Sequence, residues 1–380
     1  MKISLRWIVL SFLAVPAPGF SAPKAPAKME VTGYVFTRGA ALQPGQVDAR
    51  RLTRINYAFA GIKGGRMVIG GPADAQNFAY LIGLKSANPQ LTVLVSVGGW
   101  LGSTNFSDMA LTASSRRVFE ESVIEFLTQY DLDGLDIDWE YPGLPGAGNP
   151  FRAEDKQNFT SLVKELRERF DGRAKKTGRR LYLTVAMGAA DEVIAHTEMR
   201  QVQKYVDTVN LMTYDYYEAA SDPTTGHHAP LFANPADPKK ASSDESVRAF
   251  EKAGVPAAKI LLGVPFYGRE WGEVPDRNHG LFQPGKPIPG AYAPFSAIDS
   301  TMLGQGFARF WDDKAQVPYL YNTEKRIFVS YEDPESLKAK CSYVRSRKLG
   351  GVMFWEYFGD SQGKLLNTID GALRPGNSKH

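Results

Sequence analysis

Eight short runs of apolar residues, rich in β-branched and aromatic side chains, recur along this chain of 380 residues with helix-length segments between them. In residues 115–130 and 153–170 the apolar side chains keep the spacing of an amphipathic helix. Strands that alternate with helices favour a parallel sheet, so eight such units predict an α/β fold of the (β/α)8 type, the TIM barrel. The runs are VTGYVF (31–36), INYAFAGI (55–62), LTVLVSVGG (91–99), LDGLDIDW (132–139), LYLTVAMG (181–188), VDTVNLMTY (206–214), ILLGVPFYG (260–268) and LGGVMFW (349–355).

The regular alternation breaks once, between the seventh and eighth runs. Residues 271–332 contain many Gly and Pro turns and short β-like pieces, but no good helix pattern. We therefore predict a small α+β insertion domain over residues 271–332, between strands seven and eight. The barrel is then predicted to occupy residues 29–270 and 333–372. Hydrophobic residues make up 43% of the chain, which is enough for a sizeable core.

The N-terminus has the pattern of a secretory signal peptide. Two basic residues precede an apolar stretch, and small residues follow it. We predict a signal peptide over residues 1–22, with cleavage near Ser21 or Ala22. A membrane anchor is the alternative, but the apolar stretch is too short and Pro16 and Pro18 interrupt it. The expectation is a secreted protein, extracellular or periplasmic, with no membrane association after cleavage.

Charge and cysteine content exclude several other classes. The net charge is +4 without a long run of Lys or Arg, so no nucleic-acid partner is predicted. The single cysteine, Cys341, cannot form an intrachain disulfide. No cluster of Cys and His suggests zinc, and we predict neither a metal nor another cofactor. The chain is predicted to be a monomer.

The fourth apolar run is unusual because it is acidic: residues 131–142 read DLDGLDIDWEYP. In a strand Asp136, Asp138 and Glu140 share one face, and the intervening Leu, Ile and Trp share the other. In a barrel the acidic face would point inward and reach the C-terminal end of the strands, where barrel active sites lie. Crowded carboxylates raise at least one pKa, and a Glu that is protonated near neutral pH is a general acid.

Other structures also carry closely spaced acidic residues. A calcium-binding EF-hand loop needs Gly at its sixth position, whereas Gly134 is fourth from Asp131. A solvated strand face would carry mixed charges and Thr rather than a row of acids beside Trp. A Mg²⁺ or Ca²⁺ site in the mouth of the barrel remains an alternative.

The acidic run resembles a motif of glycoside hydrolase family 18, the chitinases. The family's DxxDxDxE pattern falls on Asp133, Asp136, Asp138 and Glu140. The resemblance extends from about residue 29 to 370, and many bacterial and animal members carry an α+β insertion between strands seven and eight. Four other segments resemble family motifs in the same order: SVGGW (96–100), MTYD (212–215), GVPFYGR (263–269) and GGVMFWEY (350–357).

The resemblance implies a retaining, substrate-assisted mechanism on chitin or chitooligosaccharides, without a cofactor. Glu140 would protonate the leaving glycosidic oxygen, and the 2-acetamido oxygen of the sugar would attack C1 to give an oxazolinium ion. Asp138 would orient the acetamido N–H, and Asp136 would share a proton with Asp138. Tyr214 would donate a hydrogen bond to the acetamido carbonyl, and water activated by Glu140 would open the ring.

The resemblance also implies a set of sugar contacts. Trp355 resembles the flat floor beneath the reacting sugar and Trp100 a stacking residue on the leaving-group side, although Tyr34 and Phe59 could equally be core residues. After MTYD many relatives carry Gly and Trp, whereas this chain has YYEAA at 216–220, so the aromatic contact there differs or rests on the tyrosines. The predicted binding residues are Tyr34, Phe59, Gly98, Gly99, Trp100, Tyr141, Met212, Asp215, Tyr267, Arg269 and Trp355.

Three functions fit this pattern. The first is a secreted chitinase that hydrolyses β-1,4 bonds of N-acetylglucosamine polymers. The second is a chitin-binding lectin of the same fold, but such lectins replace the acid that Glu140 provides. The third is an endo-β-N-acetylglucosaminidase acting on N-glycans, against which the insertion and GVPFYGR favour chitin chains. We therefore expect a chitinase.

Overall fold

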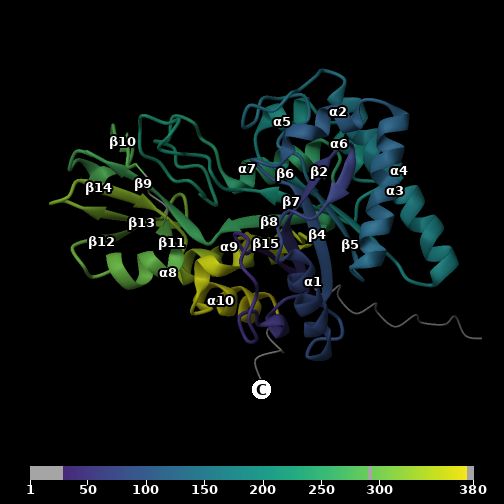
Figure 1. Ribbon diagram of the computed structural model, residues 1–380. Coiled ribbons are helices and arrows are strands. Elements are labelled where there is room, and N and C mark those ends of the chain that lie inside the picture. The colour runs from purple at the N-terminus through teal and green to yellow at the C-terminus, as the bar shows by residue number, and fades with distance from the viewer. Residues whose placement is uncertain (1–28, 290–292, 375–380) are drawn as a thin grey trace, which may run out of the picture.

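The computed structural model describes residues 29–289 and 293–374. Eight parallel strands are hydrogen-bonded in the order β1-β15-β8-β7-β6-β5-β4-β2, and pairing of β1 with β2 closes the ring (Figure 1). The predicted (β/α)8 barrel is confirmed, whereas the predicted signal peptide lies outside the described residues. The barrel strands are β1 (Glu30–Phe36), β2 (Arg54–Lys63), β4 (Thr92–Gly98), β5 (Gly134–Asp138), β6 (Tyr182–Gly188), β7 (Thr208–Met212), β8 (Ile260–Pro265) and β15 (Gly351–Trp355); β3 (Arg66–Val68) extends β2 as a hairpin.

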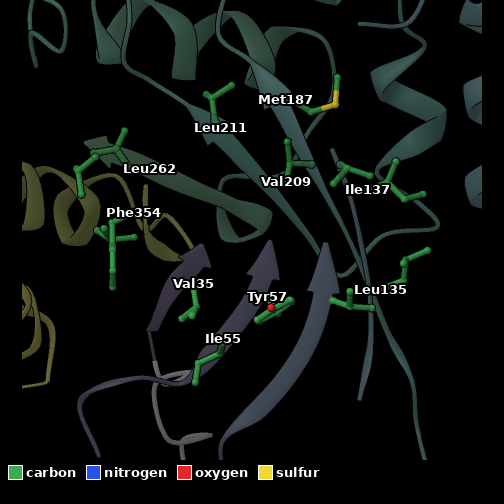
Figure 2. Close-up of a cluster of buried hydrophobic side chains, with 14 of the residues drawn as sticks. Val35, Ile55, Tyr57, Leu135, Ile137, Met187, Val209, Leu211, Leu262 and Phe354 are labelled. Carbon is green, nitrogen blue, oxygen red and sulfur yellow. The ribbon is translucent and has the colours of Figure 1, made fainter. Parts of the chain in front are cut away.

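The two faces of the barrel strands differ in polarity because side chains alternate along a strand. The outward face is apolar and packs under the helices, and Figure 2 shows part of this layer, including Val35, Ile55, Leu135 and Ile137. Parallel strands are normally apolar on both faces. Here the inward face carries a set of buried polar residues instead: Thr32, Asn56, Ser96, Asp136, Asp138, Thr184 and Asn210.

Helices cover the outside of the barrel (Figure 1). Both helices predicted from apolar spacing are present as α3 and α4, and α4 ends where Gly178 adopts a left-handed conformation with φ of 71°. Within the described residues, none of the helices combines the length and apolarity needed to cross a bilayer. The helices are α1 (Asp74–Gly83), α2 (Phe106–Ala110), α3 (Ala113–Gln129), α4 (Asp155–Thr177), α5 (Asp191–Ala195), α6 (Met199–Val202), α7 (Ser243–Lys252), α8 (Phe295–Ala297), α9 (Pro334–Ser346) and α10 (Lys364–Leu373).

A second, antiparallel sheet lies beside the barrel and is inserted between β8 and β15 (Figure 1). The predicted insertion between the seventh and eighth barrel strands is therefore confirmed. Its first strand starts at Tyr267, directly after β8; the domain boundaries at 271 and 332 stay a prediction. This sheet has its own aromatic core around Trp271 and Phe328. Its strands are β9 (Tyr267–Gly272), β10 (Lys286–Pro287), β11 (Ala293–Pro294), β12 (Ala308–Asp312), β13 (Val317–Asn322) and β14 (Ile327–Ser330).

A fully buried ion pair joins α9 to the residues that follow the second sheet. Lys340 pairs with Glu332 and donates to the carbonyl of Ala229 at 2.7 Å. Lys340→Met should lower the free energy of unfolding by about 3–5 kcal/mol, because Glu332 would then be a buried charge without its counterion. Urea denaturation measures this effect. The matched control Lys338→Met changes an exposed residue of the same helix and should stay within about 0.5 kcal/mol of wild type. Equal effects of the two substitutions would contradict the prediction.

Candidate active site

The carboxyl ends of the barrel strands open into a cleft of about 2570 Å³. Asp136 lies beneath this cleft, fully buried inside the barrel. All the other predicted site residues line the cleft: Glu140, Asp138, Tyr214, Tyr34, Phe59, Gly98, Gly99, Trp100, Tyr141, Met212, Asp215, Tyr267, Arg269 and Trp355. The structure thus brings together residues that are up to 321 positions apart, from Tyr34 to Trp355, at one end of the barrel.

Glu140 lies two residues beyond the end of β5, not on the strand as the alternation predicted. Side chains replace the sheet partners of its backbone. The backbone N–H of Glu140 donates to Ser103 Oγ at 2.9 Å, and Asn149 Nδ2 donates to the carbonyl of Glu140 at 3.1 Å. These two contacts fix the position of the acid above the barrel. Neither Ser103 nor Asn149 was identified from the sequence.

Asp136 accepts four hydrogen bonds from four different strands. Its Oδ1 accepts from Thr184 Oγ1 at 2.5 Å and from Asn210 Nδ2 at 3.1 Å. Its Oδ2 accepts from the Tyr34 hydroxyl at 2.9 Å and from Ser96 Oγ at 2.7 Å. Burial raises the pKa of Asp136 above its usual value, and the hydrogen bonds from Thr184, Ser96 and Tyr34 oppose that rise. Tyr34 therefore supports the acidic residues from below.

Asp138 lies between Asp136 and the cleft. The four donors occupy both oxygens of Asp136, and in the described part of the chain no hydrogen bond joins it to Asp138. The Oδ1 atom of Asp138 is buried and has no partner among the described residues. Burial first, and then the negative charges of Glu140 and Asp136, raise the pKa of Asp138 well above its usual value. Asp138 is thus a carboxyl that can hold a proton.

The carboxyl of Glu140 has the electrostatics of a general acid. Burial is the largest cause that raises its pKa, to about 7, and the charges of Asp215 and Glu218 add to the rise. A hydrogen bond from Tyr141 acts in the opposite direction. A carboxyl with this pKa is protonated in a large fraction of molecules at neutral pH, so it can donate a proton there.

An aromatic floor underlies the cleft. The ring of Trp355 is stacked with that of Phe59 at 5.5 Å and with that of Phe36 at 5.6 Å between centroids. Tyr34 contacts the same indole at 5.8 Å in a tilted arrangement. An exposed aromatic face suits the apolar C–H face of a sugar ring. Phe36 was missed from the sequence, although it shares a strand face with Tyr34 and the period of two would have identified it.

A network of charged groups forms one wall. Asp215 accepts hydrogen bonds from the Tyr267 hydroxyl and from Arg269 Nε, each at 2.7 Å, and His228 Nδ1 lies 3.5 Å from it. Burial would raise the pKa of Asp215, but the contacts from His228 and Arg269 outweigh it and hold the pKa far below its usual value. Asp215 is therefore a fixed anion. Its neighbour Tyr214 is partly buried, and burial raises the pKa of its hydroxyl well above the usual value, so the hydroxyl keeps its proton.

Two glycines allow the third-strand loop to approach the acidic strand. Gly98 and Gly99 have φ of 112° and 79°. A Cβ on Gly98 would lie 2.1 Å from the carbonyl oxygen of Asp138, and one on Gly99 would lie 2.6 Å from the ring of Phe59. Both positions therefore require glycine. The next residue, Trp100, is 50% exposed at the rim of the cleft, a position from which its indole can stack on a bound sugar.

In the segment after MTYD, the two neighbouring residues Tyr216 and Tyr217 lie in different surroundings, and only one of them faces the cleft. Tyr217 is buried in the core of the second sheet and donates to Asp237, so it does not face the cleft. Tyr216 lines the cleft, and its hydroxyl lies 2.7 Å from Ser246 Oγ. Glu218 also lines the cleft and forms an ion pair with Arg269. This chain thus presents one tyrosine and a carboxylate on that side.

The described residues contain no group of three or more His, Cys, Asp or Glu side chains that could hold a metal ion.

The profile of Glycosyl hydrolases family 18 matches residues 30–360. The chain belongs to this family. Chitinase A1 of Niallia circulans is 35% identical over the whole of this chain, which spans 62% of that protein's length. Chitotriosidase-1 of Mus musculus is 33% identical over 93% of this chain and 77% of its own length.

Solved structures agree with this assignment. A family 18 N-acetylglucosaminidase from Paenibacillus barengoltzii superimposes with a TM-score of 0.84 at 40% identity, covering 90% of this chain and 99% of the other. A class V chitinase from Nicotiana tobaccum in complex with NAG4 superimposes with a TM-score of 0.82 at 27% identity, covering 91% and 99%.

Proposed function

We propose that this family 18 protein is a chitinase that hydrolyses β-1,4 bonds between N-acetylglucosamine units with retention of configuration. The observation that carries the proposal is Glu140, a half-buried carboxyl with a pKa raised to about 7, placed in a cleft with an aromatic floor. Such a group can protonate a glycosidic oxygen at neutral pH and afterwards activate water as a base. The aromatic floor supplies binding energy for the sugar without chemistry of its own.

In the proposed mechanism the substrate provides the nucleophile. Asp138 is only two residues from Glu140 and both line the same cleft, whereas a protein nucleophile would have to attack from the opposite face of the sugar. The unpartnered Oδ1 of Asp138 is suited to accept the acetamido N–H, and the protonated hydroxyl of Tyr214 to donate to the acetamido carbonyl. Both contacts would orient the acetamido oxygen toward C1 and stabilise the oxazolinium ion.

A second candidate within the same chemistry is release of single N-acetylglucosamine units from chain ends. It is favoured by the similarity to the Paenibacillus barengoltzii N-acetylglucosaminidase. Chitinase A1 and the NAG4 complex of the class V chitinase support action on longer chains. The large cleft and the half-exposed Trp100 at its rim also favour a chain of several sugars over a single unit.

Chitin oligomers of two to six units, with products separated by chromatography, test both candidates. A chitinase should produce dimers and trimers from hexamers and act slowly on dimers, whereas monomers as the first product would identify the second candidate. Binding of oligomers without any turnover would contradict the proposal and indicate a lectin. Cleavage of the chitobiose core of N-glycans in preference to chitin oligomers would indicate an endo-β-N-acetylglucosaminidase.

We also propose export of the chain, because residues 1–22 have a signal-peptide pattern and chitin is too large to enter a cell. N-terminal sequencing of the protein from culture medium and periplasm would test both the export and the cleavage near Ser21 or Ala22.

The rate should fall as pH rises through about 7, because the acid has to be protonated and the pKa of Glu140 is raised to about 7. Glu218→Gln removes a negative charge that raises this pKa, so the basic limb of kcat/KM should move to lower pH by a fraction of a unit. The matched control is Glu245→Gln, which changes a cleft carboxylate on α7 and should leave the midpoint in place. A basic limb that moves upward in Glu218→Gln would refute the assignment of this limb to Glu140.

A further inference from the structure

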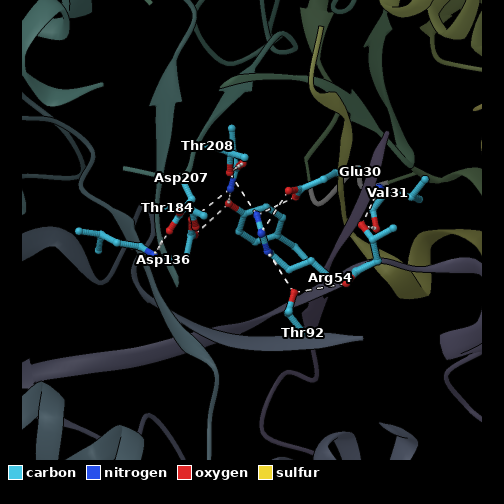
Figure 3. Close-up of polar contacts among 12 residues, drawn as sticks. Glu30, Val31, Arg54, Thr92, Asp136, Thr184, Asp207 and Thr208 are labelled. Atoms are coloured by element: carbon cyan, nitrogen blue, oxygen red, sulfur yellow. Dashed lines mark hydrogen bonds and ion pairs between the residues drawn. The ribbon is translucent and has the colours of Figure 1, made fainter. Parts of the chain in front are cut away.

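A line of polar side chains continues below Asp136 through the interior of the barrel (Figure 3). It starts at Arg54 on β2, which is 3% exposed. Arg54 Nη1 donates to Thr208 Oγ1 at 3.2 Å, and Thr208 Oγ1 donates to Asn210 Oδ1 at 3.1 Å. Asn210 Nδ2 then donates to Asp136 Oδ1 at 3.1 Å. None of these three supporting residues touches the cleft.

The direction of the donors in this line is fixed by its first member. A guanidinium has donors only, so Thr208 has to accept from Arg54 and use its single proton for Asn210. The carbonyl of the Asn210 amide is thereby held toward Thr208, and its N–H group faces Asp136. The same N–H group also donates to the Tyr34 hydroxyl at 3.0 Å, which in turn donates to Asp136. Every donor therefore points from the cation to the carboxylate.

Arg54 is itself well held at the opposite end of the barrel from the cleft. Its Nη1 forms an ion pair with Glu30 Oε2 at 2.8 Å, and its Nε donates to Thr92 Oγ1 at 3.3 Å (Figure 3). The guanidinium is permanently charged. A substitution that interrupts the line at Thr208 leaves these contacts in place, so it does not create a buried charge without a partner.

We propose that Arg54 is a positioning residue which acts through Thr208 and Asn210 to keep Asp136 an accepting carboxylate, so that the proton of the acidic pair resides on Asp138 beside the cleft. This inference rests on the proposed function, because it assigns a role within that site. The family resemblance led us to expect a proton shared between Asp136 and Asp138. In this proposal the proton is not shared: Asp136 is ionised and Asp138 is protonated.

The protonation of Asp136 is governed by charged or titratable groups on three strands. These are Arg54 on β2, Tyr34 on β1 and Asp138 on its own strand. Tyr34 is neutral and donates, and Asp138 opposes ionisation of Asp136. Arg54 favours that ionisation, both by its charge and by the orientation that it imposes on Asn210. Without the line, the Asn210 amide is free to turn its oxygen toward Asp136.

Thr208→Val interrupts the line while preserving the shape of the side chain, and Thr208→Ser, which keeps the hydroxyl, is the matched control. The first measurement is the midpoint of thermal unfolding between about pH 4 and pH 8. A carboxyl whose pKa is higher in the folded chain than in the unfolded chain lowers stability, most fully above the folded pKa; the cost shrinks as pH falls through the folded pKa and disappears below the unfolded pKa. Thr208→Val should raise the pKa of Asp136 further. The difference in melting temperature between Thr208→Val and Thr208→Ser should therefore be larger at pH 8 than at pH 4 by about 2 °C. A remainder that does not depend on pH reflects the two hydrogen bonds that Val cannot form.

The second measurement is the pH profile of kcat/KM on a chitin oligomer. The acidic limb of Thr208→Val should move to higher pH by about one unit, and that of Thr208→Ser should coincide with wild type. If Thr208→Val and Thr208→Ser differ in melting temperature by the same amount at every pH, Thr208 only contributes to stability. That result would refute the proposed influence of Arg54 on the protonation of Asp136. A pH-dependent gap with an unchanged acidic limb would overturn the positioning role.

The stability measurement does not need activity, so it tests the proposed link from Arg54 to Asp136 even if the wild-type protein fails to cleave chitin oligomers. Such a failure would contradict the proposed function alone. If Thr208→Val does not fold, Thr208→Ala removes the same hydroxyl without adding a methyl group and is judged by the same two results.

Discussion

Replacement of Glu140 by Gln should abolish turnover of chitin oligomers and leave their binding largely intact. The amide has nearly the same shape as the carboxyl, and Ser103 and Asn149 hold the backbone of this residue through contacts that the substitution does not touch. Gln cannot donate a proton to the leaving oxygen or activate water. A positioned acid contributes about 10²–10⁴-fold to the rate. Steady-state kinetics and calorimetric titration measure the two effects separately.

Two results would contradict this assignment. Residual kcat above about 10⁻² of wild type would give the acid role to another group. Loss of oligomer binding together with activity would mean that Glu140 mainly supports the substrate. Glu245→Gln, a carboxylate elsewhere in the same cleft, is the control for a general effect of removing negative charge and should retain most of the rate.

The parts of the site that could be predicted are those that follow from local periodicity. Alternation along the fourth run placed Asp136 and Asp138 inside the barrel and its apolar residues outside, and both placements hold. The same rule could have identified Asn210, which lies two residues before Met212 on β7, the strand of the sixth run. It was overlooked because an Asn in an apolar run carries no chemical signal until its partners are known. Those partners include Tyr34 and Asp136, which come from two other strands.

The parts that could not be predicted depend on where strands end and which segments meet. Alternation extended the acidic strand to Glu140, but the chain leaves the sheet two residues earlier because Ser103 and Asn149 bind its backbone. Likewise, nothing local distinguishes Tyr216 from Tyr217. Their different positions depend on the second sheet: the ring of Tyr217 packs into the core of that sheet, and Tyr216 is left at the cleft.

The insertion also contributes directly to the site. Tyr267 and Arg269 belong to β9, the first strand of the second sheet, and both contact Asp215, which follows β7 of the barrel. The sheet and the barrel therefore share the wall that holds Asp215 as an anion. The charge of Asp215 in turn raises the pKa of Glu140, so the second sheet helps to set the protonation of the acid from outside the barrel.

The reaction should require an N-acetyl group on the sugar to the non-reducing side of the cut bond. In the proposed mechanism Asp138 and Tyr214, which line the same cleft as Glu140, bind the acetamido N–H and its carbonyl rather than attack C1. In a two-carboxylate retaining enzyme the nucleophile lies about 5–5.5 Å from the acid across the sugar ring. In the proposed mechanism the acetamido oxygen fills that role.

Cellulose oligomers and fully deacetylated chitosan have the same β-1,4 linkage but lack this oxygen, so their cleavage should be undetectable under conditions in which chitin oligomers of equal length are consumed. The loss should be at least about 10³-fold, because a neighbouring group held in place by the enzyme replaces a bimolecular attack. A partially acetylated chitosan is the matched control: its products should carry N-acetylglucosamine at the new reducing end. Chitin oligomers should first give β-anomers, visible by NMR before mutarotation, and a thiazoline mimic of the oxazolinium ion should inhibit. Rapid cleavage of fully deacetylated chitosan, or α-anomers as the first product, would show that a group of the protein or a water molecule attacks instead.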